Sequence, residues 1–148
     1  MSTRTVLVVD DNQDSRTILC AVFRHCGYTV IEAPDGEYAL RIALERAVAL
    51  VVAELYIPVG DAACLVEVLK RRAETAAIPV LVVTSRVMPA DREHAREVGC
   101  DVILGKPFDL RGLIAAAEEL LGSTRPTLAS PALDPSASAR SESGPVPA

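Results

Sequence analysis

The sequence predicts an α/β fold in which a five-stranded parallel sheet is covered by helices on both faces. Two observations lead to this prediction. Short apolar runs, rich in β-branched residues, alternate with segments of helical period, five times each before Gly122. The runs are apolar throughout, which indicates strands that are buried on both faces. Alternation of this kind is typical of a parallel sheet whose crossover connections contain the helices.

The five strands are expected where the apolar runs are densest. Each run is four or five residues long, and turn-forming residues or helical patterns bound it on both sides. In chain order the expected strands are Thr5 to Val9, Tyr28 to Glu32, Leu50 to Ala53, Pro79 to Val83 and Asp101 to Leu104.

A helix is expected after each strand, because apolar residues recur there at helical spacing and a start or stop signal is present. Proline in a first turn and glycine after a last turn are typical of helix ends. The signals are Asn12 or Asp14 as first cap and Gly27 as first stop, the Asp35-Gly36 turn, Asp61 as third cap, Pro89 and Gly99 around the fourth helix, and the amphipathic run Leu110 to Leu121.

The composition changes sharply after Gly122. Residues 123–148 hold five of the ten prolines, six serines and no aromatic residue, without helix or strand period. Such a segment cannot bury enough apolar surface to offset its ordering entropy. We therefore expect one domain over residues 1–122, a disordered Pro/Ser/Ala-rich tail over residues 123–148, and no output domain.

The bulk composition excludes several classes of function. The formal charge of −5 gives no reason to expect a nucleic-acid-binding surface, which is normally basic. No apolar run approaches the length of a membrane span, and the apolar stretch near the N-terminus is too short for a signal peptide. We expect a cytoplasmic protein without nucleic-acid or membrane contacts. The four cysteines form no C-x-x-C pair and are expected to be buried, reduced thiols.

Polar groups follow four of the five strands. Asp10 and Asp11 follow the first, Glu54 the third and Thr84 the fourth, and Lys106 lies just after the fifth. Because parallel strands direct their carboxyl ends to one edge of the sheet, these residues are expected to converge there.

The chemistry of this group is that of phosphoryl transfer to a carboxylate. Three carboxylates and one ammonium sum to −2, which one Mg²⁺ ion would balance. Thr84 and Lys106 are suited to hold phosphoryl oxygens. Simpler interpretations remain open: the acid pair as a helix N-terminal charge, Lys106 as its salt-bridge partner, and Thr84 as a strand-end hydroxyl. His25 and His94 are expected on solvated helix faces.

With these residues in view, the chain resembles the receiver domain of two-component response regulators over residues 4–121. The order and spacing of the matching segments agree throughout. They are Val6 to Asn12 with its two aspartates, Asp35-Gly36 with Ala39-Leu40, Pro58 four residues past the acceptor position, Val83-Thr84-Ser85, Ala95 with Gly99, and Lys106-Pro107-Phe108.

The resemblance implies a flavodoxin-like sheet in the order 2-1-3-4-5 and a role in bacterial two-component signalling rather than enzyme activity. It implies that a histidine kinase donates a phosphoryl group to the acceptor position, occupied by Glu54, and that kinases or other signalling proteins are the partners. Asp10 and Asp11 become a magnesium-binding acid pair, with Asp11 favoured as the direct ligand. Glu54 and the backbone carbonyl of Tyr56 complete the metal site, and Thr84 and Lys106 become the catalytic pair.

Two departures from the family pattern concern a single mechanism. Glu54 stands where the family has aspartate, and Ile103 stands at the switch position, where the family has an aromatic ring. The extra methylene of Glu54 displaces a nucleophile by roughly 1 to 1.5 Å, and a misplacement of about 1 Å can cost about 100-fold in rate. Three interpretations stay open: Glu54 still accepts a phosphoryl group, it provides a fixed charge that imitates the phosphorylated state, or the site has decayed and the fold is kept for protein binding.

A second class of function is a phosphatase of the haloacid-dehalogenase type that uses Asp10. Such enzymes open with Asp-x-Asp, whereas Asn12 stands in the third place here, so the general acid is absent. The receiver interpretation, as a pseudo-receiver that acts by protein contact, explains more of the sequence.

Overall fold

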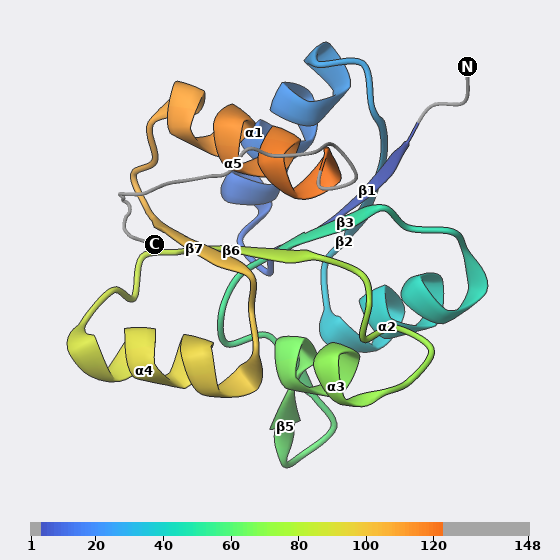
Figure 1. The fold of residues 1–148 in the computed structure, drawn as a ribbon, viewed down its shortest axis with the longest axis vertical. Coiled ribbons are helices and arrows are strands. Elements are labelled where there is room, and N and C mark those ends of the chain that lie inside the picture. Colours follow the sequence, from blue (N-terminus) through green and yellow to red (C-terminus); the bar gives the residue numbers. More distant parts are fainter. Residues whose placement is uncertain (1–3, 123–148) are drawn as a thin grey trace.

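The computed structural model describes residues 4–122. Figure 1 shows a central sheet between two layers of helices. The elements, in chain order, are β1 (Thr5–Val9), α1 (Gln13–His25), β2 (Thr29–Ala33), α2 (Gly36–Glu45), β3 (Leu50–Ala53), β4 (Pro58–Val59), β5 (Ala63–Cys64), α3 (Leu65–Arg71), β6 (Val80–Thr84), α4 (Pro89–Val98), β7 (Val102–Gly105) and α5 (Leu110–Leu121).

The main sheet has five parallel strands in the order β2-β1-β3-β6-β7. This is the predicted order 2-1-3-4-5 once the short β4–β5 pair is left out of the count, and it confirms the flavodoxin-like α/β fold. The order reverses at β1 and β3, and ligand sites of open α/β sheets lie beside such a reversal at the carboxyl edge. The fold therefore fixes one edge of the sheet as the place to look for a site.

The core has two layers because successive residues of a strand point to opposite faces of the sheet. Val6 and Val8 of β1 pack with α1 and α5 on one face. Leu7 and Val9 pack with α2, α3 and α4 on the other. Every residue of β3 and β6 is buried, which agrees with the apolar runs being covered on both sides.

Most helix ends agree with the signals in the sequence. The side chains of Asn12, Asp35 and Asp109 accept hydrogen bonds from backbone N–H groups in the first turns of α1, α2 and α5. Gly99 ends α4 in the left-handed region, with φ of 89°, which glycine adopts without strain. The first helix ends at His25, so Gly27 lies just beyond its cap.

The prediction for the third helix was wrong at its start. Asp61 does not cap a helix, because it lies in the turn of a two-stranded antiparallel hairpin formed by β4 and β5. The helix begins only at Leu65, and its cap residue Cys64 makes no side-chain cap bond.

The hairpin packs tightly against the start of α2. A Cβ atom on Gly36 would lie 2.3 Å from the carbonyl oxygen of Pro58, a distance that no side chain tolerates. The Glu37 carboxylate accepts a hydrogen bond of 2.8 Å from the N–H of Gly60 in the hairpin turn. The segment that follows Glu54 is thus held against α2.

Three other predictions concern features outside the sheet. Cys26 is exposed and Cys64 and Cys100 are half-buried, so only Cys20 matches the expectation of a buried thiol; all four are free. Within residues 4–122, no helix combines the length and the hydropathy that a bilayer crossing requires. The expected tail, residues 123–148, lies outside the described residues.

Candidate functional site at the carboxyl edge of the sheet

Asp10 is the most deeply buried charge at the carboxyl edge. It follows β1 directly and is 1% exposed. Its Oδ1 accepts a hydrogen bond of 2.9 Å from the N–H of Asn12, and its Oδ2 accepts one of 2.8 Å from the Lys106 ammonium. A buried carboxylate requires such partners, so Lys106 compensates the charge that the fold places there.

Glu54 reaches both groups that were predicted to hold phosphoryl oxygens. It follows β3, and its Oε1 accepts a hydrogen bond of 3.1 Å from the Lys106 ammonium. Its Oε2 accepts from the hydroxyl of Thr84 and, at 3.1 Å, from the N–H of Leu55. Both carboxylate oxygens of Glu54 are therefore hydrogen-bonded.

Thr84 and Lys106 are positioned by adjacent strands. Thr84 ends β6 and is fully buried. Lys106 follows β7, and its backbone N–H donates to the carbonyl of Thr84 at 2.8 Å, which continues the strand pairing to the edge of the sheet. The hydroxyl of Thr84 also accepts a 3.1 Å hydrogen bond from the N–H of Arg86.

The electrostatic balance of this cluster leaves one negative charge. Asp10 and Glu54 contribute −2 and Lys106 contributes +1, so the sum is −1. Burial lowers the pKa of Lys106, but the hydrogen bonds to Asp10 and Glu54 outweigh it, and the pKa of this ammonium is raised. Lys106 is thus a cation at neutral pH, which makes it a fixed positive group between two acids.

The predicted metal ligands differ in exposure and in their contacts. Asp11 is exposed, while Asp10 and Glu54 both turn to Lys106. Among residues 4–122, no set of three or more His, Cys, Asp or Glu side chains is placed to hold a metal ion. Lys106 donates to one carboxylate oxygen of Asp10 and one of Glu54, and the predicted magnesium site stays a prediction for this chain.

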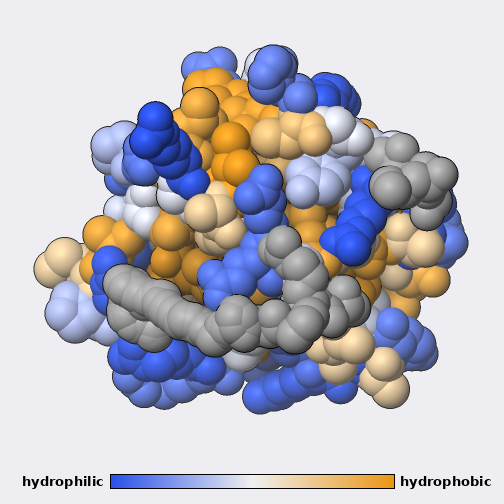
Figure 2. Space-filling model, turned by 45° about the horizontal axis from the view of Figure 1, so that its top comes forward, coloured by the Kyte–Doolittle hydropathy of each residue, from blue (hydrophilic) through white to orange (hydrophobic). Residues whose placement is uncertain are grey.

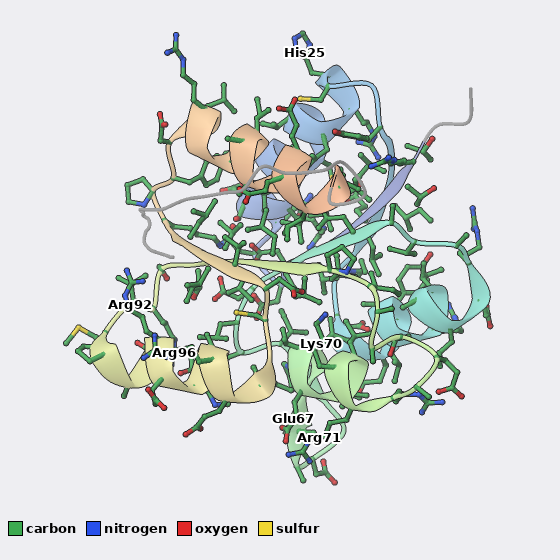
Figure 3. The ribbon with its side chains drawn as sticks, in the orientation of Figure 1. His25, Glu67, Lys70, Arg71, Arg92 and Arg96 are labelled. Carbon is green, nitrogen blue, oxygen red and sulfur yellow. The ribbon has the colours of Figure 1, made fainter. Side chains whose placement is uncertain are left out.

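The remaining predicted residues lie in different parts of the fold. Ile103 is half-buried and packs against the core layer of α2, α3 and α4. Tyr56 is 36% exposed, and its hydroxyl donates a hydrogen bond to Asp91 on α4. The expectation that His94 lies on a solvated face was wrong: His94 is half-buried and stacks on the Tyr56 ring, whereas His25 is exposed at the end of α1 and points away from the sheet (Figure 3).

Arg16 is a residue of this edge that the sequence did not single out. Its Nη1 donates a 2.7 Å hydrogen bond to the carbonyl of Asp10, and its Nε lies 3.1 Å from Oε1 of Glu32 on β2. The side chain is only 14% exposed and ties the end of β1 to the neighbouring strand. The signal in the sequence that could have indicated Arg16 is its position, one helical turn after the cap residue Asn12.

The layer formed by α1 and α5 carries exposed apolar residues at its surface. Figure 2 shows hydrophobic residues reaching the surface on the side where α1 and α5 lie. Ile18 on α1 and Leu110 on α5 are 54% and 51% exposed, respectively.

Comparison with known proteins identifies similar chains. The family model described as "Response regulator receiver domain" matches residues 6–118. The transcriptional regulatory protein PrrA of Mycobacterium tuberculosis is 39% identical over 122 residues, which is 80% of this chain and 52% of that protein. The phosphate regulon transcriptional regulatory protein PhoB of Klebsiella pneumoniae is 31% identical over 123 residues, 83% of this chain and 54% of that protein. The chain spans about half the length of these curated relatives.

Solved structures share the fold. The receiver domain of sensor histidine kinase PA1611 from Pseudomonas aeruginosa, which has a magnesium ion in its active-site cleft, matches with a TM-score of 0.73 and 25% identity over 82% of this chain and 99% of that one. Chemotaxis protein CheY4 of Vibrio cholerae matches with a TM-score of 0.72 and 24% identity over 80% and 99%. The phosphatase alternative gains no support: Asn12, at the place of its general acid, caps α1 by accepting from the N–H of Ser15 at 2.8 Å.

Proposed function

Because this chain belongs to the response regulator receiver domain family of two-component signalling, we propose that it is a pseudo-receiver in which Glu54 supplies a permanent negative charge. The observation that carries the proposal is that Glu54 binds both Thr84 and Lys106. In a receiver, the groups at these two positions hold the phosphoryl oxygens. The carboxylate thus makes at rest the contacts that a phosphoryl group would make after transfer.

The same contacts argue against phosphorylation of Glu54. An attacking carboxylate oxygen must approach the phosphorus in line and at close range, and about 1 Å of misplacement can cost about 100-fold in rate. Both oxygens of Glu54 are hydrogen-bonded, and Lys106 is shared with Asp10. An incoming phosphoryl donor needs Thr84 and Lys106 for its own binding. It would first have to break the contacts of these two residues with Glu54.

The proposed output is protein–protein contact by a domain over residues 1–122. Receiver domains are signalling modules that contact histidine kinases and other signalling proteins, and we propose partners of this kind here. The charge of −5 supports a protein partner rather than a nucleic acid.

The test is phosphorylation by a small-molecule donor. The native chain, incubated with acetyl phosphate and Mg²⁺, should keep its intact mass. The Glu54→Asp variant should gain one phosphoryl group, with a rate about 100-fold above that of the native chain, because the shorter side chain restores the position of the nucleophile.

Two further variants make the test specific. Glu54→Gln lacks a nucleophile and should keep its mass, so any gain in it would report a modification elsewhere. A stoichiometric gain of one phosphoryl group on Glu54 of the native chain would refute the proposal.

Magnesium binding is a separate question, and it stays a prediction for this chain. The P. aeruginosa receiver with magnesium in its cleft supports it, while the engagement of Asp10 and Glu54 with Lys106 opposes it. Titration of Mg²⁺ followed by NMR should shift the amides near Asp10 and Asp11 if the ion binds. Asp11→Asn should then weaken binding, whereas Asp14→Asn on the exposed first turn of α1 should not.

A further inference from the structure

The side chain of Tyr56 connects the loop after Glu54 to helix α4. Its hydroxyl donates a 2.6 Å hydrogen bond to Oδ1 of Asp91 in the first turn of α4. Its ring stacks on the ring of His94, one turn further along the helix, with centroids 5.1 Å apart and planes 13° from parallel. Tyr56 is thus held to α4 by a polar and an aromatic contact together.

The two carboxylate oxygens of Asp91 accept hydrogen bonds from different partners, one from Tyr56 and one from the N-terminal end of α4. Oδ2 of Asp91 accepts a 3.1 Å hydrogen bond from the N–H of Met88, the cap position of α4. The hydrogen bond to Asp91 raises the pKa of Tyr56, so the phenol remains a donor at neutral pH. Movement of Tyr56 would therefore act on the group that caps α4.

A second path joins the same two parts through the end of β6. The Thr84 hydroxyl donates to Glu54 and accepts from the N–H of Arg86. The Arg86 guanidinium lies 5.1 Å from the centroid of the Tyr56 ring, within the range of a cation–π contact. Glu54 and Tyr56 are thus connected twice: by the chain itself, in which they are two residues apart, and by the contacts through Thr84 and Arg86.

We propose that Tyr56 is a positioning residue that couples the contacts of Glu54 to the N-terminal turn of α4. Ile103, which stands at the switch position, has no aromatic ring for this role. The proposal rests on the proposed function in one respect, namely that Glu54 sets the state that is transmitted. The first turn of α4 responds because Asp91 holds both Tyr56 and the helix cap. Arg92 and Arg96, which α4 carries at the surface (Figure 3), would move with it.

The experiment is a double-variant cycle read by NMR on the full chain. Glu54→Ala removes the acceptor of the Thr84 hydroxyl and should shift the amide resonances of residues 91–95. Tyr56→Phe keeps the ring but removes the hydrogen bond to Asp91. In the Tyr56→Phe background the shifts caused by Glu54→Ala should fall by about half or more in α4, while those at residues 82–84 persist.

Tyr38→Phe is the matched control. Tyr38 lies on α2 with the Arg41 guanidinium 4.9 Å from its ring centroid, so it shares the cation–π contact and lacks the link to α4. The α4 shifts caused by Glu54→Ala should be unchanged in this background. A merely structural role of Tyr56 would change α4 by a constant amount, whether or not Glu54 is present.

The outcomes separate the two proposals. Equal α4 shifts in the native and Tyr56→Phe backgrounds, or no α4 shift in either, would overturn the role of Tyr56. Phosphorylation of Glu54 by acetyl phosphate would overturn the fixed-charge proposal and leave the result of the cycle standing, because the cycle involves no phosphoryl donor.

Discussion

Two partly buried lysines lie at opposite edges of the same sheet, and they serve different ends. Lys70 on α3 is 15% exposed and lies 2.9 Å from Oδ2 of Asp101, just before β7 (Figure 3). Its ammonium also donates to the carbonyls of Ile78 and Ala76, at 2.8 and 3.2 Å. Lys106 is 20% exposed and contacts the carboxylates of Asp10 and Glu54.

The difference lies in charge balance and in the nature of the partners. Lys70 pairs with one carboxylate, that of Asp101, so this ion pair is neutral. The other two partners of its ammonium are backbone carbonyls in the segment before β6, which the lysine holds in place. The carboxylate of Asp101 in turn accepts from the N–H of Val80 at 2.7 Å. Lys106 has two acids and leaves one negative charge beside an exposed rim. We refer to the edge with the surplus charge, where the proposed site lies, as the functional edge, and to the edge with the balanced pair of Lys70 and Asp101 as the structural edge.

The largest effect is expected from removing the ammonium at the functional edge. Lys106→Met keeps the aliphatic stem but leaves Asp10 buried without its cation. We expect the free energy of unfolding to fall by about 3 kcal/mol, the scale for breaking a buried ion pair. Denaturant unfolding followed by circular dichroism measures this, and an unchanged midpoint would contradict it.

Raising the pH should remove the same contribution gradually. The pKa of Lys106 is raised in the folded state, so its ion pairs stabilise the fold fully below the unfolded lysine pKa of about 10.4. That contribution is lost as the pH rises through the folded-state pKa. The stability difference between the native chain and Lys106→Met should therefore be constant near neutrality and shrink only in strongly alkaline solution. A difference that shrinks between pH 6 and 8, the window set by the usual range of histidine titration, would point to another group.

A smaller loss is expected at the structural edge. Lys70→Met removes an ion pair in which Asp101 is 37% exposed and can be solvated, together with two bonds to carbonyls. We expect the free energy of unfolding to fall by about 1–2 kcal/mol. The same unfolding measurement applies. A loss larger than that of Lys106→Met would reverse the ranking of the two edges.

The smallest effect on the free energy of unfolding is expected at an exposed ion pair, which serves as the baseline for the two lysine variants. Arg96 and Glu93 form an exposed pair on α4, with 69% and 60% of their side chains accessible. Arg96→Ala should change the free energy of unfolding by no more than about 0.5 kcal/mol, because exposed pairs are solvated and screened. A larger change would mean that α4 is held to the domain through Arg96.

Much of the fold follows from local pattern, and the exceptions have physical reasons. The apolar runs predicted all five strands of the sheet because burial on both faces leaves a dense signal. The hairpin at residues 58–64 was missed because a ladder of two residues on each strand shows no period. Asp61 was read as a cap because aspartate serves equally well in turns and at helix starts.

The site was predictable as far as the topology determines it. Asp10, Glu54, Thr84 and Lys106 converge because parallel strands share an edge, and that requires no knowledge of side-chain contacts. Lys106 contacts Asp10, whereas Asp11 is exposed. The spacing of the sequence does not indicate which of these two neighbouring acids the lysine contacts. The contact of Tyr56 with Asp91 spans 35 residues and carries no sequence pattern.

The close approach of Gly36 to Pro58 has a consequence for the residues that position 36 accepts. The missing side chain is required by a backbone oxygen of the hairpin and by nothing in the charge cluster. In a library randomised at this position, survivors should keep glycine even when the acceptor residue has been replaced. The requirement for glycine at this position comes from the packing of the hairpin on α2, and it does not depend on the residues of the charge cluster.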